Sequence, residues 1–233
     1  MRRIASTKKK PFAPRLVGVI ASPAALERAV RLRTPPDFFE VRLDAFVYSL
    51  GQLRDGLSRL RAPLILTARH PLEGGAGELN FSTRRELLRN FLGYATFVDL
   101  ELRSVRRMKT LLAEMRRHQT GLIISHHDFC TTPSSRKLRL LTKSAAALGP
   151  SFFKIVVRTD TAEQLEQLAA FFMEARGGEV NIAAMGVGKW GLQSRLQFDR
   201  LGSACTYVSL GEANAEGQPS LNQLRRARRA YTK

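Results

Sequence analysis

The stretch Phe152-Phe153-Lys154-Ile155-Val156-Val157 is a short, mostly apolar run without regular alternation, and an amphipathic stretch follows it at residues 162–176. Runs of this kind are typical of strands whose two faces are both buried in a parallel sheet. In the second stretch, Leu165, Leu168 and Phe172 recur at the spacing of one helix face. Together the two stretches predict a strand followed by a covering helix.

The same alternation continues in both directions along the chain. Two helix starts are marked best, because Thr161 with Gln164 and Thr83 with Glu86 match the capping box that satisfies free amides at a helix N-terminus. The predicted strands are residues 16–20, 38–43, 64–68, 97–102, 122–125, 152–157, 180–185 and 205–209. The predicted helices are residues 24–33, 50–61, 83–94, 105–117, 134–148, 162–176, 192–201 and 221–231.

Eight strands that alternate with eight helices predict an α/β fold of the (β/α)8 TIM barrel type. A doubly wound sheet is the alternative, but it usually has fewer strands at this length, and no Gly-x-Gly-x-x-Gly follows the first strand. Since no linker or change in composition divides the chain, we expect a single barrel domain over residues 16–233. A basic, flexible arm is expected over residues 1–15.

The composition excludes several classes of protein. Of the 233 residues, 44% are hydrophobic, so a disordered chain is excluded. Two cysteines are too few for a disulfide framework, and no apolar run approaches the roughly 20 residues that cross a bilayer. These features predict a cytoplasmic protein that does not contact a membrane.

The chain is strongly basic, with 38 Lys and Arg against 20 Asp and Glu and a net charge of +18. Such a surplus usually indicates a nucleic acid or another polyanion as partner. Many of the cations lie near the two ends of the chain, and most others lie in helix-like stretches, where a solvated surface is the ordinary explanation. No recognition motif accompanies them, so we expect nucleic-acid binding only through the basic termini.

Ionisable residues gather at the ends of the predicted strands. A barrel carries its active site at the C-terminal ends of its strands, so this pattern indicates a catalytic site rather than a plain surface. The residues concerned are Glu40, Arg42, Asp44, Arg69, His70, Asp99, Glu101, His126, His127, Asp128, Lys154 and Arg195.

Lys154 is the most informative of them, because it places an amine inside an apolar strand. Desolvation and nearby cations would lower the pKa of such an amine, and a neutral amine can attack a ketone to form an iminium. Two alternatives remain open. The side chain could extend from the strand end towards water, or it could pair with a carboxylate for structural reasons.

His127 is a candidate general acid and base, because histidine exchanges protons near neutral pH. On an extended segment, His126 and His127 point to opposite faces, so at most one of them can face the barrel mouth. Glu73, on a glycine-rich loop, could orient the histidine, although it could equally be a solvated acid. The spacing of His126, His127 and Asp128 matches no zinc signature, so we expect no metal site.

Two further features could bind an anionic substrate. Arg195 would suit a bidentate carboxylate clamp, or it could form a salt bridge on a helix face. The small residues at 211–219 would suit a loop that closes over substrate, although ordinary turn chemistry explains them equally well.

Taken together, these segments resemble type I 3-dehydroquinate dehydratase, the Schiff-base enzyme of the shikimate pathway, from about Leu16 to Gln218. Any one motif is weak, but their order and spacing are specific. The motifs are Glu40-Val41-Arg42-Leu43-Asp44, Thr67-Ala68-Arg69, Glu73-Gly74-Gly75, Asp99-Leu100-Glu101-Leu102, Ser125-His126-His127-Asp128-Phe129, Phe153-Lys154-Ile155, Ser194-Arg195 and Glu216-Gly217-Gln218.

The resemblance implies a (β/α)8 barrel that uses no metal or organic cofactor and is commonly a homodimer. Lys154 would form the imine, His127 would transfer protons and Glu73 would orient His127. The substrate, 3-dehydroquinate, would be held by the remaining polar residues. These are Arg195 and Gln218 at the carboxylate, Glu40, Arg42 and Arg69 around the ring hydroxyls, and Asn214 in the closing loop.

The sequence departs from the family pattern in the closing loop and at one histidine. Asn214 stands where a serine is usual, Glu216 replaces a usual proline, and His126 occupies a position that is often aromatic. Two other functions stay open: a class I aldolase-like barrel acting on another oxo-acid, and a basic barrel that binds RNA or another polyanion.

Overall fold

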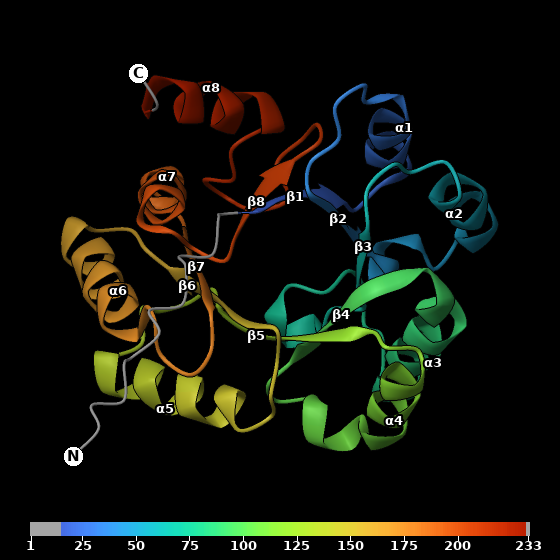
Figure 1. Cartoon of the computed structure of the whole chain (residues 1–233), viewed down its shortest axis with the longest axis horizontal. Coiled ribbons are helices and arrows are strands. Elements are labelled where there is room, and N and C mark those ends of the chain that lie inside the picture. Colours follow the sequence, from blue (N-terminus) through green and yellow to red (C-terminus); the bar gives the residue numbers. More distant parts are fainter. Residues whose placement is uncertain (1–14, 232–233) are drawn as a thin grey trace, which may run out of the picture.

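A computed structural model describes residues 15–231 as a barrel of eight parallel strands inside a ring of helices (Figure 1). The strands are β1 (Arg15–Ile20), β2 (Phe38–Arg42), β3 (Leu64–Thr67), β4 (Ala95–Glu101), β5 (Gly121–Asp128), β6 (Phe152–Arg158), β7 (Ile182–Val187) and β8 (Cys205–Ser209). The helices are α1 (Pro23–Arg31), α2 (Leu50–Leu57), α3 (Phe81–Phe91), α4 (Lys109–Arg117), α5 (Ser135–Ala146), α6 (Ala162–Ala175), α7 (Gly191–Leu201) and α8 (Leu221–Tyr231).

The strands pair in chain order from β1 to β7, and β8 returns to pair with β1. The strands β7 and β8 lie at the two ends of this series, and a backbone hydrogen bond of 2.8 Å from Ala204 N to the Ile182 carbonyl bridges the seam between them. The barrel is therefore nearly closed. The predicted (β/α)8 TIM barrel is confirmed, and the doubly wound sheet is wrong.

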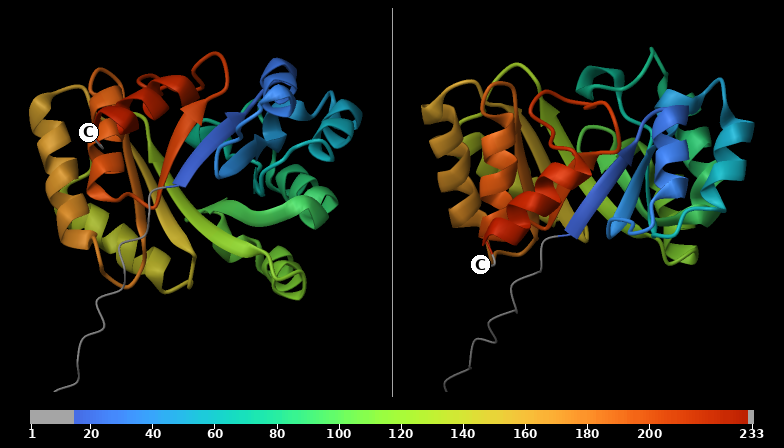
Figure 2. Two further views of the ribbon diagram at one scale, coloured as in Figure 1. Left: turned by 45° about the horizontal axis from the view of Figure 1, so that its top comes forward. Right: turned by 90° about the horizontal axis from the view of Figure 1, so that it is seen from above.

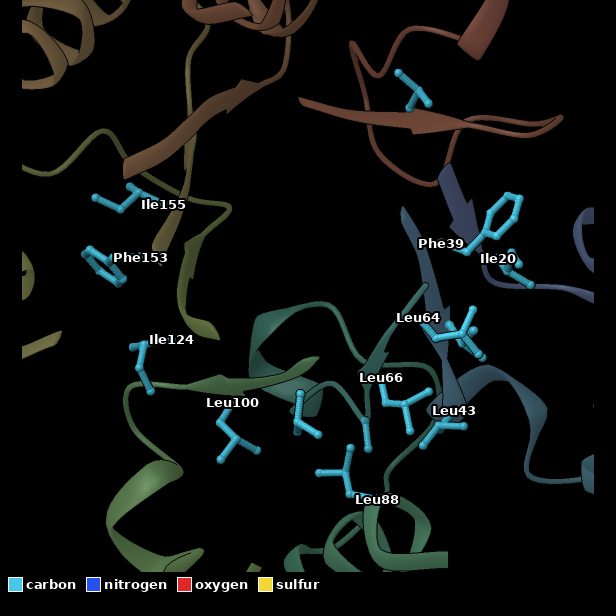
Figure 3. Close-up of a cluster of buried hydrophobic side chains, with 14 of the residues drawn as sticks. Ile20, Phe39, Leu43, Leu64, Leu66, Leu88, Leu100, Ile124, Phe153 and Ile155 are labelled. Atoms are coloured by element: carbon cyan, nitrogen blue, oxygen red, sulfur yellow. The ribbon is translucent and has the colours of Figure 1, made fainter. Parts of the chain in front are cut away.

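Alternate residues of each strand face two different apolar layers. On β6, Phe153 and Ile155 pack outwards in the layer between strands and helices, where Figure 3 shows them with Ile124 and Leu100. Phe152 and Val156 of the same strand face the barrel interior. Because side chains of a strand alternate between faces, Lys154 must point inwards with Phe152 and Val156.

The predicted helix starts have opposite outcomes. At α6, Thr161 and Gln164 form the expected capping box. At α3 the predicted cap is wrong, because the helix begins two residues earlier, at Phe81, and the Asn80 side chain accepts a 2.9 Å hydrogen bond from the Thr83 backbone N–H. Asn is a slightly better N-cap than Thr, and Asn80 is the residue at which the preceding loop meets the helix.

The predicted basic arm over residues 1–15 falls outside the described residues except for Arg15, which is the first residue of β1. Within residues 15–231, no helix combines the length and the apolar character needed to cross a bilayer. In the right panel of Figure 2, the loop between β8 and α8 lies across the end of the barrel towards which the strand arrows point.

Candidate active site

A cavity of about 400 Å³ opens among the C-terminal ends of the strands. Every residue that the sequence proposed for catalysis or substrate binding lines this cavity. These residues are Glu40, Arg42, Arg69, Glu73, His127, Lys154, Arg195, Asn214 and Gln218. They come from strands and loops spread over the whole barrel, and the fold brings all of them together.

Lys154 lies deep in this cavity and is only 4% exposed. Its Nζ is 3.1 Å from Oε1 of Glu40 and 3.2 Å from Oδ2 of Asp99, and it lies 4.1 Å from the centre of the Tyr207 ring. The sequence left two surroundings open for this amine, an apolar and cationic one that would lower its pKa and a pairing with a carboxylate. The structure has the second arrangement, with two carboxylate partners that reach across the barrel interior from β2 and β4.

Arg69 organises these carboxylates. It forms two hydrogen bonds with Asp99, of 3.0 and 2.8 Å, and further bonds with Glu101 at 3.2 Å and with the Ser125 hydroxyl at 2.6 Å. Although burial alone would raise the pKa of Asp99, the charges of Arg69 and Lys154 hold it well below its ordinary value. Asp99 is therefore a fixed negative charge beneath the amine.

Glu73 and His127 form the second polar group of the cavity. Glu73 is 3% exposed, and its Oε2 lies 2.9 Å from Nδ1 of His127 and accepts a 3.0 Å hydrogen bond from the His127 backbone N–H. Arg103 contacts the other carboxylate oxygen at 3.3 Å. Two contacts to one oxygen fix the plane of the imidazole and leave its Nε2 free of this carboxylate.

Burial shifts both groups towards their neutral forms. It raises the pKa of Glu73 to about 7, although the charge of Arg69 opposes the shift. Burial, with the charges of Arg69 and Lys154, lowers the pKa of His127 well below its ordinary value. Near neutral pH the imidazole is therefore uncharged. When Glu73 is ionised, its carboxylate favours the tautomer that carries the proton on Nδ1, and Nε2 is then a free base.

Arg195 and the β8–α8 loop, residues 210–220, form another wall of the cavity. Arg195 is 3% exposed and donates from Nε to the Gly217 carbonyl at 3.3 Å, while its Nη1 has no hydrogen-bond partner among the described residues. Burial lowers the pKa of Arg195 to about 10, so the guanidinium is still charged at neutral pH. In the loop, Oε1 of Gln218 accepts a 2.7 Å hydrogen bond from the Asn214 backbone N–H.

Arg42 lies at the rim of the cavity, and its guanidinium is hydrogen-bonded to other residues of the protein. It donates to both carboxylate oxygens of Asp44, at 3.1 and 2.8 Å, and to the Gly74 carbonyl at 2.8 Å. Asp44 in turn accepts hydrogen bonds from the backbone N–H groups of Arg69 and Ala76. This carboxylate therefore fastens the loop that carries Glu73.

The structure adds residues that the sequence did not single out. Tyr207 and Arg158 both line the cavity. An inward position on a strand would have identified Tyr207, two residues after the inward-facing Cys205, and Arg158, four residues after Lys154. His126 does not line the cavity, whereas His127 does, as the opposite directions of adjacent strand residues require.

A metal site is not built from the described residues. Within residues 15–231, no group of three or more His, Cys, Asp or Glu side chains is arranged to hold a metal ion.

Comparison with known proteins shows to which family this chain belongs. The family model described as Type I 3-dehydroquinase matches residues 20–233. A 3-dehydroquinate dehydratase of Thermococcus gammatolerans is 32% identical over 213 residues, which cover 90% of this chain and 95% of that protein. Among solved structures, the 3-dehydroquinate dehydratase of Geobacillus kaustophilus HTA426 is similar with a TM-score of 0.84 at 24% identity, covering 94% of this chain and 91% of that one. The 3-dehydroquinate dehydratase of Aquifex aeolicus VF5 has a TM-score of 0.78 at 26% identity, covering 94% and 99% of the two chains. The chain belongs to the type I 3-dehydroquinase family.

Proposed function

We propose that this protein is a carbon–oxygen lyase that dehydrates 3-dehydroquinate to 3-dehydroshikimate through a Schiff base on Lys154. Family membership and the names of its relatives support the reaction. The observation that carries the mechanism is that a buried lysine and an oriented histidine line one cavity. As in the family it resembles, we propose a homodimer without a bound cofactor, acting in the cytoplasm.

Lys154 must lose a proton before it can attack a ketone. Two carboxylates are within hydrogen-bond distance of Nζ, at 3.1 Å for Glu40 and 3.2 Å for Asp99. Asp99 is a poor proton acceptor, because its pKa is held well below its ordinary value by Arg69 and Lys154. We therefore assign the proton to Glu40, whose other close donors are the Thr67 hydroxyl at 2.9 Å and Arg69 at 3.8 Å.

The neutral amine adds to the C3 ketone of the substrate to give a carbinolamine. The proton held by Glu40 passes to the carbinolamine hydroxyl, which leaves as water, and this step gives the iminium. This cation makes the C2–H acidic, and His127 removes that proton to give an enamine. The enamine then expels the C1 hydroxyl, which leaves as water with a proton returned by His127. Water hydrolyses the conjugated iminium, which releases 3-dehydroshikimate and regenerates the amine. General acid and base catalysis of this kind contributes about 10²–10⁴ in rate.

The remaining cavity residues are proposed to bind the substrate. Arg195 has an unused Nη1 donor, which supports a role with Gln218 in holding the substrate carboxylate. Asn214 is proposed to close over that carboxylate. Glu40 and Arg42 are proposed to contact ring hydroxyls. Arg69 is proposed to act there mainly through the carboxylates that it holds, because its guanidinium is already bonded to three side chains.

Borohydride trapping tests the mechanism. Reduction in the presence of 3-dehydroquinate is expected to leave a covalent adduct on Lys154, detected by peptide mass spectrometry, while enone absorbance follows product formation. Lys154→Ala is expected to lose both the adduct and turnover, whereas His127→Ala should keep the adduct and lose turnover. Turnover without a trappable adduct would exclude the imine route. An adduct formed with other oxo-acids but not with 3-dehydroquinate would favour an aldolase-like enzyme.

A further inference from the structure

An ion pair joins the end of β6 to the β8–α8 loop above the cavity. Arg158 lies four residues after Lys154 and lines the same cavity. Its Nη1 is 3.1 Å from Oε2 of Glu216, the residue that replaces a usual proline of the family. On its other side, Nε of Arg158 is 2.5 Å from Oδ2 of Asp160. Neither Arg158 nor Glu216 has a role in the proposed chemistry.

The Arg158 side of this pair is held in place by the neighbouring loop. Oδ1 of Asp160 accepts a 3.0 Å hydrogen bond from the Lys189 backbone N–H in the β7–α7 connection. Gly188 precedes it with a φ of 102°, and a Cβ there would lie 2.3 Å from the same oxygen. The close approach of Asp160 therefore depends on a glycine, and Asp160 in turn fixes the direction of the guanidinium.

The Glu216 side belongs to a loop that rests on α7. A Cβ at Gly217 would lie 2.6 Å from Cα of Gly191, so the two backbones are in direct contact. Arg195 reaches the same place through its 3.3 Å hydrogen bond to the Gly217 carbonyl. The Glu216 side chain is thus one of two points at which a cation that lines the cavity holds this loop.

Charge explains why Glu216 needs a partner. An unpaired carboxylate at the cavity wall would repel an anionic substrate, and Glu216 lines that wall. Arg158, which also pairs with Asp160, offsets part of this charge and at the same time draws the loop towards β6. Asn214 and Gln218 lie two residues on either side of Glu216 in the same loop and are joined by the 2.7 Å hydrogen bond described above, so a shift of the loop backbone at Glu216 would move them as well.

We infer that Arg158 and Glu216 are positioning residues, and that their ion pair holds the β8–α8 loop over the cavity so that Gln218 stays beside the substrate carboxylate. The statement about substrate rests on the proposed function. The statement about the loop does not. The opposite reading is that Glu216 occupies Arg158 in competition with the substrate carboxylate.

Two measurements on Glu216→Gln, Arg158→Gln and the double variant test the inference. Hydrogen exchange of the peptide that contains residues 210–220, measured without substrate, is expected to become about two- to fivefold faster in each variant, as for a partly exposed ion pair. The KM for 3-dehydroquinate is expected to rise by a similar factor without a fall in kcat. The double variant should be no worse than Arg158→Gln, and Arg158→Lys should restore part of the effect.

The matched control is Glu174→Gln, which breaks the exposed 2.9 Å pair of Arg139 with Glu174 between α5 and α6 and should change neither measurement. Unchanged hydrogen exchange of residues 210–220 in both single variants would overturn the inference that the ion pair holds the loop. A lower KM in Glu216→Gln would overturn it in favour of competition for Arg158. If the wild-type protein does not turn over 3-dehydroquinate, the proposed function fails, and the exchange measurement still decides whether the ion pair holds the loop.

Discussion

The pair of Glu73 and His127 predicts a specific pH dependence. If the ionised carboxylate keeps the proton of the imidazole on Nδ1, catalysis needs Glu73 ionised, and burial raises the pKa of Glu73 to about 7. With this pKa, about nine-tenths of the carboxyl groups are ionised at pH 8 and about one-tenth at pH 6. We therefore expect kcat/KM to fall about tenfold between pH 8 and pH 6 and about tenfold again to pH 5. His127 does not produce this step, because burial lowers its own pKa well below 6.5.

The assay is the initial rate of enone formation at low substrate concentration, with circular dichroism at each pH to show that the protein stays folded. Glu73→Gln is the matched variant, because an amide keeps the size of the side chain but does not titrate. It should be about 10²-fold less active at pH 8, within the range of a general acid–base contribution, and its profile should be flat through pH 7. A profile that is flat in the wild type, or a step that persists in Glu73→Gln, would refute the assignment.

Two predictions concern stability. Asp99→Ala leaves Arg69 and Lys154 without their shared buried carboxylate. It should lower the free energy of unfolding, measured by urea titration, by about 3–5 kcal/mol. A loss under about 1 kcal/mol would mean that the neighbouring charged side chains rearrange to replace the missing carboxylate. Asn80→Ala removes the cap of α3 and should cost about 1 kcal/mol, whereas Thr83→Ala, whose side chain is exposed, should stay within about 0.5 kcal/mol. A larger loss in Thr83→Ala than in Asn80→Ala would restore Thr83 as the cap.

The sequence predicted the barrel because its strands are buried on both faces and so appear as apolar runs between amphipathic helices. It also predicted where Lys154 lies, since an amine inside such a run faces the barrel interior at the active-site end. The partners of Lys154 could not be predicted in this way. Glu40 and Asp99 are separated from it by 114 and 55 residues, and which inward carboxylates meet the amine depends on the register and curvature of the closed sheet.

The same limit applies to Arg69 and to the cap of α3. Arg69 was expected to contact substrate, but its guanidinium is hydrogen-bonded to several inward-facing acceptors. These acceptors come from different strands, so the pattern of a single strand does not predict how many of them meet Arg69. At α3, Asn80 and Thr83 are both good caps, and only the path of the preceding loop decides between them. Local signals therefore located the elements, and long-range packing decided the contacts.

The balanced charges at the base of the cavity have a consequence for the proposed covalent step. Glu40 and Asp99 supply two negative charges, and Arg69 and Lys154 supply two positive ones. A protonated iminium carries the same single positive charge as the ammonium that it replaces. The base of the cavity would then keep the same electrostatic balance before and after the proposed carbon–nitrogen bond forms, so the covalent step would require no rearrangement of its charged groups.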